Sequence, residues 1–206
     1  MQENGLVIGP GGNASIIDDD GIIWITPSGI PFVEMGIDDF VPIKKNTGKI
    51  LNSKLTPSSE LPLHLFIYRM RNNIKCVIHA HPPYVIALSA ANVHIRPLFP
   101  DFVIYLGGHI PQIPYMTPCT EEMGRAVAEK IKEFNSCILK NHGAVTVGKT
   151  VKEAYIRMQV LESGAEIFFK SLQIGTPDIL TDKDINEILN LDIEKYRKKL
   201  LENPNK

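Results

Sequence analysis

One short segment, IKCVIHAH at residues 74–81, constrains the fold of this 206-residue chain more than any other. Its apolar and β-branched residues are typical of a buried strand. Residues two apart on a strand point to the same face, so His79 and His81 should present their imidazoles side by side. The fold therefore has to bury this strand and carry two histidines at its C-terminal end.

The patterns on either side of this strand mix strands and helices without a regular βαβ alternation. Further strands are predicted for a hairpin at residues 15–26, for short pieces within 33–57, and for a pair at 137–148 that breaks at residues 141–143. Residues 95–118 are rich in proline and are expected to be irregular, with extended segments. These strands are too unevenly spaced to form a regular parallel sheet.

Helices are predicted where a capping residue precedes an apolar pattern with helical period. The expected helices run from the N-cap Ser59 to about residue 72, over residues 82–92, from the N-cap Thr120 to about residue 134, from a capping box of Thr150 and Glu153 onward, and from about Thr181. We expect a single domain over residues 1–206, in which layers of helices cover a sheet that is not purely parallel.

Composition excludes several classes of function. Lysine plus arginine number 22 and aspartate plus glutamate 23, a net charge of −1, which argues against a protein that coats nucleic acid or an anionic membrane. No apolar run approaches the roughly 20 residues of a membrane span, and the N-terminus does not resemble a signal peptide. The three cysteines, Cys76, Cys119 and Cys137, are predicted to be free thiols in a reducing cytoplasm.

The histidines offer the clearest chemistry. His79 and His81 can supply two nitrogens to one Zn²⁺, although one core and one surface histidine would give the same pattern. His142 lies in KNHGA at the break between two apolar β segments, where it could equally be a surface turn residue. Together the three form a three-nitrogen set with an open fourth position, which is typical of catalytic zinc sites.

A carboxylate and two hydroxyls lie just before the first long helix, in PSSE. Glu60 could simply favour the positive end of the helix, or it could ligate a metal and act as a base. Ser58 and Ser59 could cap the helix, or bind an anion such as phosphate together with free backbone amides. His64, one turn later, is predicted to be a packing residue or to support the site from behind.

Two loops of small residues could complete an anion site. GPGGNAS at residues 9–15 leads into a strand, so it is neither a Rossmann fingerprint nor a P-loop. With TPSG at 26–29 and the serines of PSSE, it supplies the hydroxyls and bare amides of a phosphate nest. No GxSxG motif is present and the cysteines lack an obvious base, which disfavours serine and thiol nucleophiles.

The order GNAS, TPSG, PSSE, HAH and NHG, followed by a long helix, resembles the class II aldolase/adducin family, from about residue 5 to 190. Among its members, the chain is most similar to fuculose-1-phosphate aldolases. The resemblance implies a three-layer α/β/α sandwich around a mixed, mostly antiparallel sheet. It also implies a cyclic homotetramer in the cytoplasm, with active sites between subunits.

The resemblance further implies roles for individual residues. His79, His81 and His142 would hold Zn²⁺, or another divalent ion such as Mn²⁺ or Co²⁺, and Glu60 would complete the empty site and become the acid/base. The implied phosphate pocket comprises Asn13, Ser28, Gly29, Ser58 and Ser59. The implied enzyme is a metal-dependent aldehyde-lyase that cleaves a ketose 1-phosphate into dihydroxyacetone phosphate and an aldehyde, through an enediolate stabilised by zinc.

Three features depart from the family pattern. Only twelve residues precede Asn13, so the helix that family members usually have there is expected to be absent or truncated. Asp101 stands where fuculose-type aldolases have a tyrosine, with Tyr105 nearby. Tyr196 is the candidate for a C-terminal tyrosine that these aldolases use from a neighbouring subunit, and it lies in a tail expected from about residue 191.

Other functions on the same site remain open. A decarboxylase or a dehydratase of a phosphorylated sugar would use the same ligands, because each develops enolate-like charge beside the metal. An epimerase is less similar, since epimerases of the family carry an aspartate where Glu60 stands. A non-catalytic, adducin-like interaction domain would not need the three histidines at all.

Overall fold

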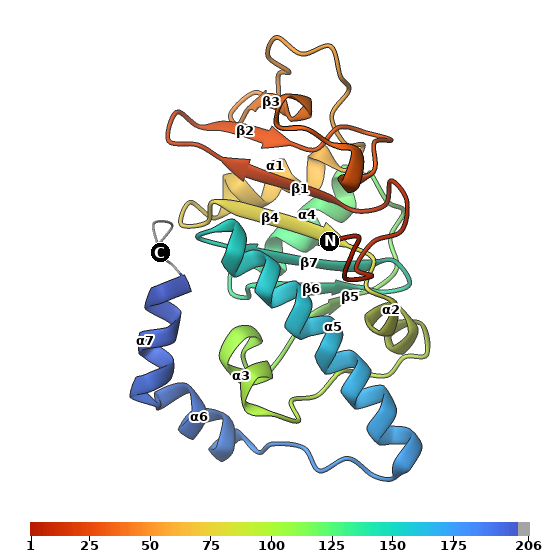
Figure 1. The fold of residues 1–206 in the computed structure, drawn as a ribbon, viewed down its shortest axis with the longest axis vertical. Helices are drawn as coiled ribbons and strands as arrows, with labels where there is room; N and C mark the ends of the chain where they lie inside the picture. Colours follow the sequence, from red (N-terminus) through yellow and green to blue (C-terminus); the bar gives the residue numbers. More distant parts are fainter. Residues whose placement is uncertain (202–206) are drawn as a thin grey trace.

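The fold of the computed structural model is built on one open sheet of seven strands (Figure 1). The described part of the chain is residues 1–201, without the side chains at positions 194, 198 and 201. In spatial order the strands are β3 (Val41–Lys44), β2 (Ile22–Ile25), β1 (Asn13–Ile17), β4 (Cys76–Ala80), β7 (Gly143–Gly148), β6 (Ser136–Leu139) and β5 (Gln112–Ile113). Only β5 and β6 pair in parallel, which confirms the mixed, mostly antiparallel sheet.

Helices cover both faces of this sheet. The α-helices of the described residues are α1 (Leu61–Met70), α2 (Pro83–Ala90), α3 (Pro100–Leu106), α4 (Glu121–Ile131), α5 (Val151–Ile174), α6 (Asp182–Asn190) and α7 (Asp192–Leu201). Two short 3₁₀ turns, Phe32–Glu34 and Ile37–Asp39, precede β3. In Figure 1, α5 crosses in front of the sheet, while α1 and α4 lie behind it. The expected α/β/α sandwich is therefore confirmed.

The central strand β4 shows how the sheet separates two cores. Val77 packs among the buried residues of α1 and α4, whereas Ile78 and Ala80 pack with α2, α3 and α5. Because both faces are covered, the strand carries apolar residues on both faces and does not alternate between apolar and polar residues. His79 shares the face of Val77, so its imidazole points to the side from which α1 approaches.

The helix after PSSE begins later than expected. Ser59 was predicted as its N-cap, but Glu60 occupies that position and makes no capping hydrogen bond with its side chain. Ser58 Oγ instead accepts the backbone N–H of Glu60, at 3.3 Å. The prediction of Ser59 as the N-cap was wrong; its hydroxyl accepts a hydrogen bond from the Cys119 thiol at 3.2 Å.

The other capped helices follow the sequence signals. Thr120 and Thr150 accept backbone N–H groups three residues on, as N-caps of α4 and α5. The carboxylate of Glu153 reaches the backbone N–H of Lys149, one residue before the position expected for a capping box. Thr181 forms a full capping box at the start of α6.

Residues 95–118 were predicted to be irregular, with extended segments. The prediction is wrong in part, because they contain the helix α3. Pro100 lies in its first turn, where the missing N–H costs nothing, and Gly107 ends it with a φ of +81°. Phe102 is 1% exposed and lies against α5 at Gly164, where an added Cβ would approach its ring to 2.6 Å. Burial against α5 therefore stabilises a short helix in a proline-rich stretch.

The C-terminal segment continues as helix. Where a tail was expected from about residue 191, the chain forms α7 up to Leu201, and residues 202–206 lie outside the described part. At the other end, residues 1–12 form turns and a loop whose Leu6 and Val7 are buried beside β4. Within residues 1–201, no helix has the length and apolarity needed to cross a lipid bilayer.

Candidate active site

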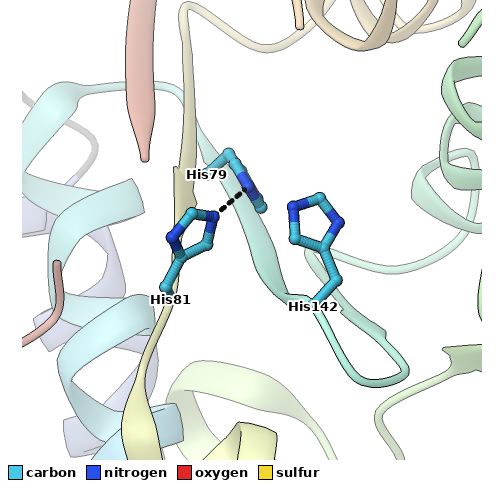
Figure 2. A group of neighbouring side chains, drawn as sticks. All are labelled: His79, His81 and His142. Carbon is cyan, nitrogen blue, oxygen red and sulfur yellow. Dashed lines mark hydrogen bonds between the residues drawn. The ribbon is translucent and has the colours of Figure 1, made fainter. Parts of the chain in front are cut away.

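Three histidines meet where β4 ends and β7 begins. In the antiparallel register His79 lies opposite Val145, and His142 lies in the turn that leads into β7. The ring centroids are 4.8–5.3 Å apart, and one nitrogen from each ring lies within 4.8 Å of the others. Figure 2 shows the three rings facing one another, with His79 and His81 on one strand and His142 beside its neighbour. The residues predicted to converge do so.

The turn before β7 has a steric reason for its sequence. A Cβ on Gly143 would lie 2.2 Å from the carbonyl oxygen of Ala80 and 3.0 Å from Cδ2 of His81. Asn141 adopts a φ of +58°, a conformation that asparagine tolerates better than most residues. The sequence NHG therefore lets the third histidine approach the end of β4 closely.

The tautomer of His79 follows from its hydrogen bond to the backbone. Its Nδ1 lies 3.0 Å from the carbonyl oxygen of Ala144, which can only accept, so Nδ1 carries the proton. In the neutral ring that binds a metal, the other nitrogen, Nε2, is then bare. It lies 3.0 Å from Nε2 of His81 and 3.0 Å from Oε2 of Glu60.

Glu60 reaches this cluster from the start of α1. The residue is 5% exposed, and its Oε2 also accepts a hydrogen bond from Nδ2 of Asn13 at 2.9 Å. Its Oε1 lies 3.5 Å from Nε2 of His142, and it is buried without a hydrogen-bond partner among the described residues. A carboxylate thus faces the three imidazoles, as the sequence predicted.

The surroundings of the site favour neutral rings at His81 and His142 and a charged carboxylate at Glu60. Burial, followed by the neighbouring His79 and His142, lowers the pKa of His81 to about 4. Burial and His79 also lower the pKa of His142. For Glu60, burial raises the pKa, but the neighbouring His79, the Asn13 amide and His142 outweigh this effect and hold the pKa well below its usual range.

These groups fit a divalent cation. A bare Nε2 of His79 and the carboxylate oxygen Oε2 of Glu60 are both acceptors. They lie 3.0 Å apart, and both residues are buried. A cation bound between them and the other two rings would satisfy these acceptors and the orphaned Oε1 of Glu60. Three neutral imidazoles and one carboxylate form a donor set typical of zinc and related metals.

The predicted anion-binding residues line a cavity of about 220 Å³ next to the histidines. All five residues of the implied phosphate pocket border it, together with Glu60, His81 and His142: they are Asn13, Ser28, Gly29, Ser58 and Ser59. Two of the backbone amides in these loops are already used within the fold. Ser28 N–H donates to Thr56 O and Ser58 N–H donates to Thr26 O, which joins the two loops around a bridge between Pro27 and Pro57.

The glycines at residues 11 and 12 have a role that the sequence did not reveal. A Cβ on Gly11 would lie 3.0 Å from Nδ1 of His81, and one on Gly12 would lie 2.8 Å from the carbonyl oxygen of His79. Gly12 also has a φ of +71°. The loop thus packs directly on the histidine strand, and only glycine lets it approach so closely.

Several other residues were missed or stand elsewhere. Cys119 borders the cavity and its thiol donates to Ser59 Oγ at 3.2 Å; no sequence pattern pointed to it. Asp101 and Tyr105 lie on α3 and Tyr196 lies on α7, and none of them is among the described residues that border the 220 Å³ cavity. His64 is fully buried behind Asn13, in agreement with a supporting role.

Comparison with known proteins establishes the family. The model of the class II aldolase and adducin N-terminal domain matches residues 1–169, which is most of the chain. The chain belongs to the class II aldolase and adducin family. The predicted membership is confirmed, as is the enzyme class, a lyase of the class II aldolase type.

Relatives of this class II aldolase chain act on phosphorylated sugars and sugar acids. The L-fuculose phosphate aldolase of Methanococcus maripaludis is 37% identical over 167 residues, which is 81% of this chain and 89% of the relative. The 3-oxo-tetronate 4-phosphate decarboxylase of Pectobacterium atrosepticum is 31% identical over 172 residues, 81% and 78% of the two chains. A solved L-fuculose 1-phosphate aldolase superposes with a TM-score of 0.85 at 28% identity, covering 95% of this chain and 90% of its own.

Proposed function

We propose that this class II aldolase reversibly cleaves a ketose 1-phosphate, similar to fuculose 1-phosphate, into dihydroxyacetone phosphate and an aldehyde. One observation carries the proposal: the cluster of three imidazoles and a carboxylate borders a cavity lined by serine hydroxyls. Such a site can stabilise negative charge at one end of a substrate and hold a phosphate at the other. The fuculose phosphate aldolases among its relatives support this choice of reaction.

In the proposed mechanism each residue has one task. His79, His81 and His142 would hold the ion, with Zn²⁺ proposed and Mn²⁺ or Co²⁺ as alternatives, and it would supply a Lewis acid for the charge that develops beside the carbonyl. In the condensation direction the carboxylate of Glu60 removes a proton from the carbon next to the carbonyl, and in cleavage it returns that proton. The residues of the phosphate pocket hold the far end of the substrate, and this binding orients the reacting carbon.

The single domain over residues 1–206, the cytoplasmic location and the homotetramer with sites between subunits are part of the same proposal. The single domain rests on the chain length and the cytoplasmic location on the three free cysteines, whereas the homotetramer rests on the resemblance to the family. Tyr196 is 57% exposed on α7, which leaves its side chain accessible to a neighbouring subunit. Light scattering of the purified protein measures the number of subunits directly, and a monomer would contradict the proposed assembly.

Release of dihydroxyacetone phosphate tests the reaction. Purified protein with added metal is given a panel of ketose 1-phosphates, and triose phosphate is detected with a coupled glycerophosphate dehydrogenase. We expect cleavage of at least one substrate, and a loss of about 10²- to 10⁴-fold in kcat for Glu60→Gln with the metal retained. Glu129→Gln, on the exposed surface of α4, is the matched control. Full activity of Glu60→Gln would show that Glu60 is not the acid/base.

A second candidate is the decarboxylation of a phosphorylated keto acid, because the Pectobacterium relative is named for that reaction. Loss of carbon dioxide from 3-oxo-tetronate 4-phosphate leaves dihydroxyacetone phosphate, so triose phosphate forms in both reactions and only the second product distinguishes them. Incubation with 3-oxo-tetronate 4-phosphate should release carbon dioxide, whereas cleavage of a ketose 1-phosphate releases an aldehyde. Dehydration and epimerisation of a phosphorylated sugar stay predictions. A purified chain that binds no metal would favour a non-catalytic, adducin-like domain.

A further inference from the structure

A row of buried polar side chains extends from Glu60 into the interior between β1 and α1. Asn13 donates to Glu60 Oε2, and its Oδ1 lies 2.6 Å from Nε2 of His64. The Nδ1 of His64 lies 2.7 Å from Ser15 Oγ, and Tyr68 Oη lies 3.0 Å from that hydroxyl. All five residues are at most 5% exposed. The row therefore forms one desolvated hydrogen-bond network that ends on the proposed acid/base.

The chemistry of the groups fixes the direction of each hydrogen bond. The carboxylate of Glu60 can only accept, so Asn13 must present its NH₂ group to it and its carbonyl oxygen to His64. His64 Nε2 then carries the proton and its Nδ1 is bare, so the Ser15 hydroxyl donates to Nδ1. Tyr68 has one proton, which it can donate to the carbonyl oxygen of Ser15 at 2.9 Å or to Ser15 Oγ at 3.0 Å. From Glu60 to Ser15, only this arrangement gives each contact one donor and one acceptor.

The state of His64 agrees with this direction. Burial lowers the pKa of His64 to about 3, so the ring is neutral at pH 7 and offers one donor and one acceptor. A neutral ring with its proton on Nδ1 would leave two acceptors, Nε2 and Asn13 Oδ1, facing each other 2.6 Å apart. Turning the Asn13 amide over would place its oxygen against the carboxylate of Glu60. Both alternatives leave buried acceptors in repulsive contact.

We propose that His64 is a positioning residue, which fixes the Asn13 amide as a hydrogen-bond donor and thereby holds the carboxylate of Glu60 in place for proton transfer. The inference rests on the proposed function, in which Glu60 exchanges a proton with the substrate. It also assigns Asn13 chiefly to Glu60, whereas the family resemblance places it in the phosphate pocket. With Oε2 held by Asn13, Oε1 is the oxygen of Glu60 that remains without a hydrogen bond among the described residues.

Exchange of a carbon-bound proton isolates the step in which Glu60 acts. Dihydroxyacetone phosphate alone, in D₂O, should exchange one proton next to its carbonyl in the presence of the metal-loaded enzyme, without any aldehyde. His64→Leu removes the donor to Asn13, whereas His64→Gln keeps an amide N–H near the position of Nε2. Exchange followed by NMR, with kcat and KM measured separately, compares the two variants with the native protein.

For His64→Leu we expect exchange to slow by about 10- to 100-fold in kcat, with KM and metal content unchanged, and we expect His64→Gln to recover most of the loss. An increase in KM at constant kcat would overturn the proposal, because it would place Asn13 and His64 in substrate binding. An equal loss in both variants would also overturn it, since a merely structural histidine gives no rescue. Absence of exchange in the native enzyme would count against the proposed function instead.

A spectroscopic test does not depend on the reaction. In metal-free protein labelled with ¹⁵N-histidine, the resonances of His64 are assigned by their loss in His64→Gln. At neutral pH we expect a neutral ring with the proton on Nε2, and we expect Asn13→Ala to shift the Nε2 resonance. A proton on Nδ1, or a charged ring, would overturn the proposal even if the His64→Leu variant failed to fold.

Discussion

Nδ1 of His79 lies 3.0 Å from the carbonyl oxygen of Ala144, on the strand that pairs with its own. The hydrogen bond directs the bare Nε2 of His79 toward Glu60 and His81. Ala144 follows His142 by two residues, so the same stretch of backbone orients one imidazole and supplies another. The ladder between β4 and β7 is therefore the frame of the proposed metal site, and anything that disturbs the ladder should disturb metal binding.

Metal content is the first prediction. Purified protein should carry about one divalent ion per chain, because three imidazoles and a carboxylate converge on one point. His142→Ala removes one of three nitrogen ligands and should lose most of the ion, as measured by elemental mass spectrometry after dialysis. His94→Ala is the matched control, since His94 is exposed and outside the cluster. Native metal content in His142→Ala would exclude His142 as a ligand.

Substitution of Gly143 tests the frame itself. In Gly143→Ala the new Cβ would lie 2.2 Å from the carbonyl oxygen of Ala80, and backbone atoms in a central ladder cannot move aside easily. We expect a loss of about 3 kcal/mol in the free energy of unfolding, at the upper end for overpacking, together with weaker metal binding. Gly36→Ala is the control, since its Cβ would meet only Asp39 Oδ2 at 3.7 Å. Urea titration measures the free energy of unfolding of both variants, and equal stability of Gly143→Ala and Gly36→Ala would contradict the argument.

The parts of the site that were predictable from sequence are those set by local periodicity. The alternation of a strand places His79 and His81 on one face, and the break at residues 141–143 marks the turn that carries His142. Pro62 marks the first turn of a helix, which places Glu60 at the start of that helix. Which helix face and which strand end meet in space was available only through the family resemblance, because no local pattern encodes it.

The parts that could not be predicted are contacts between segments distant in the chain. The network from Glu60 to Tyr68 combines β1 with α1, and its polar residues look like ordinary core positions in the sequence. Gly11 and Gly12 appear to be turn residues until the histidine strand is placed against them. The helix α3 was missed because Pro100 suggested an irregular segment, although a proline before an apolar run and a glycine after it is also the signature of a short helix.

Two exposed serines that border the cavity should contribute to the affinity for the sugar phosphate. Ser28 and Ser59 are both exposed and border the cavity, so their hydroxyls can be removed without leaving a buried cavity. We expect Ser28→Ala or Ser59→Ala to raise KM for the sugar phosphate about tenfold at little change in kcat, because a hydrogen bond to a charged phosphate contributes about 1.5 kcal/mol or more.

Inorganic phosphate provides an independent measurement of the same site. Its inhibition constant should rise in parallel with KM in both serine variants. Ser53→Ala is the matched control, because its hydroxyl is bonded locally to Leu55 and lies outside the cavity. Unchanged inhibition by phosphate in Ser28→Ala and Ser59→Ala would place the phosphate elsewhere.

The pH dependence of stability should reveal the buried His64. Its pKa falls from 6.5 to about 3 on folding, because burial disfavours the charged ring. Between these two values the unfolded chain binds a proton that the native protein does not, so the free energy of unfolding decreases as the pH falls. The contribution of this one residue is about 1.4 kcal/mol per pH unit below about pH 6.5.

Comparison with His64→Gln isolates this contribution, because glutamine does not titrate and the other histidines are common to both proteins. Urea denaturation of the metal-free proteins, from about pH 7 down to about pH 5, should show the native protein losing stability faster than the variant. The difference in free energy of unfolding between the native protein and His64→Gln should change by roughly 2 kcal/mol between pH 6.5 and pH 5, since one pKa unit corresponds to about 1.4 kcal/mol. Parallel pH profiles would mean that His64 takes up a proton in the folded state, and the direction assigned to the buried network would then be wrong.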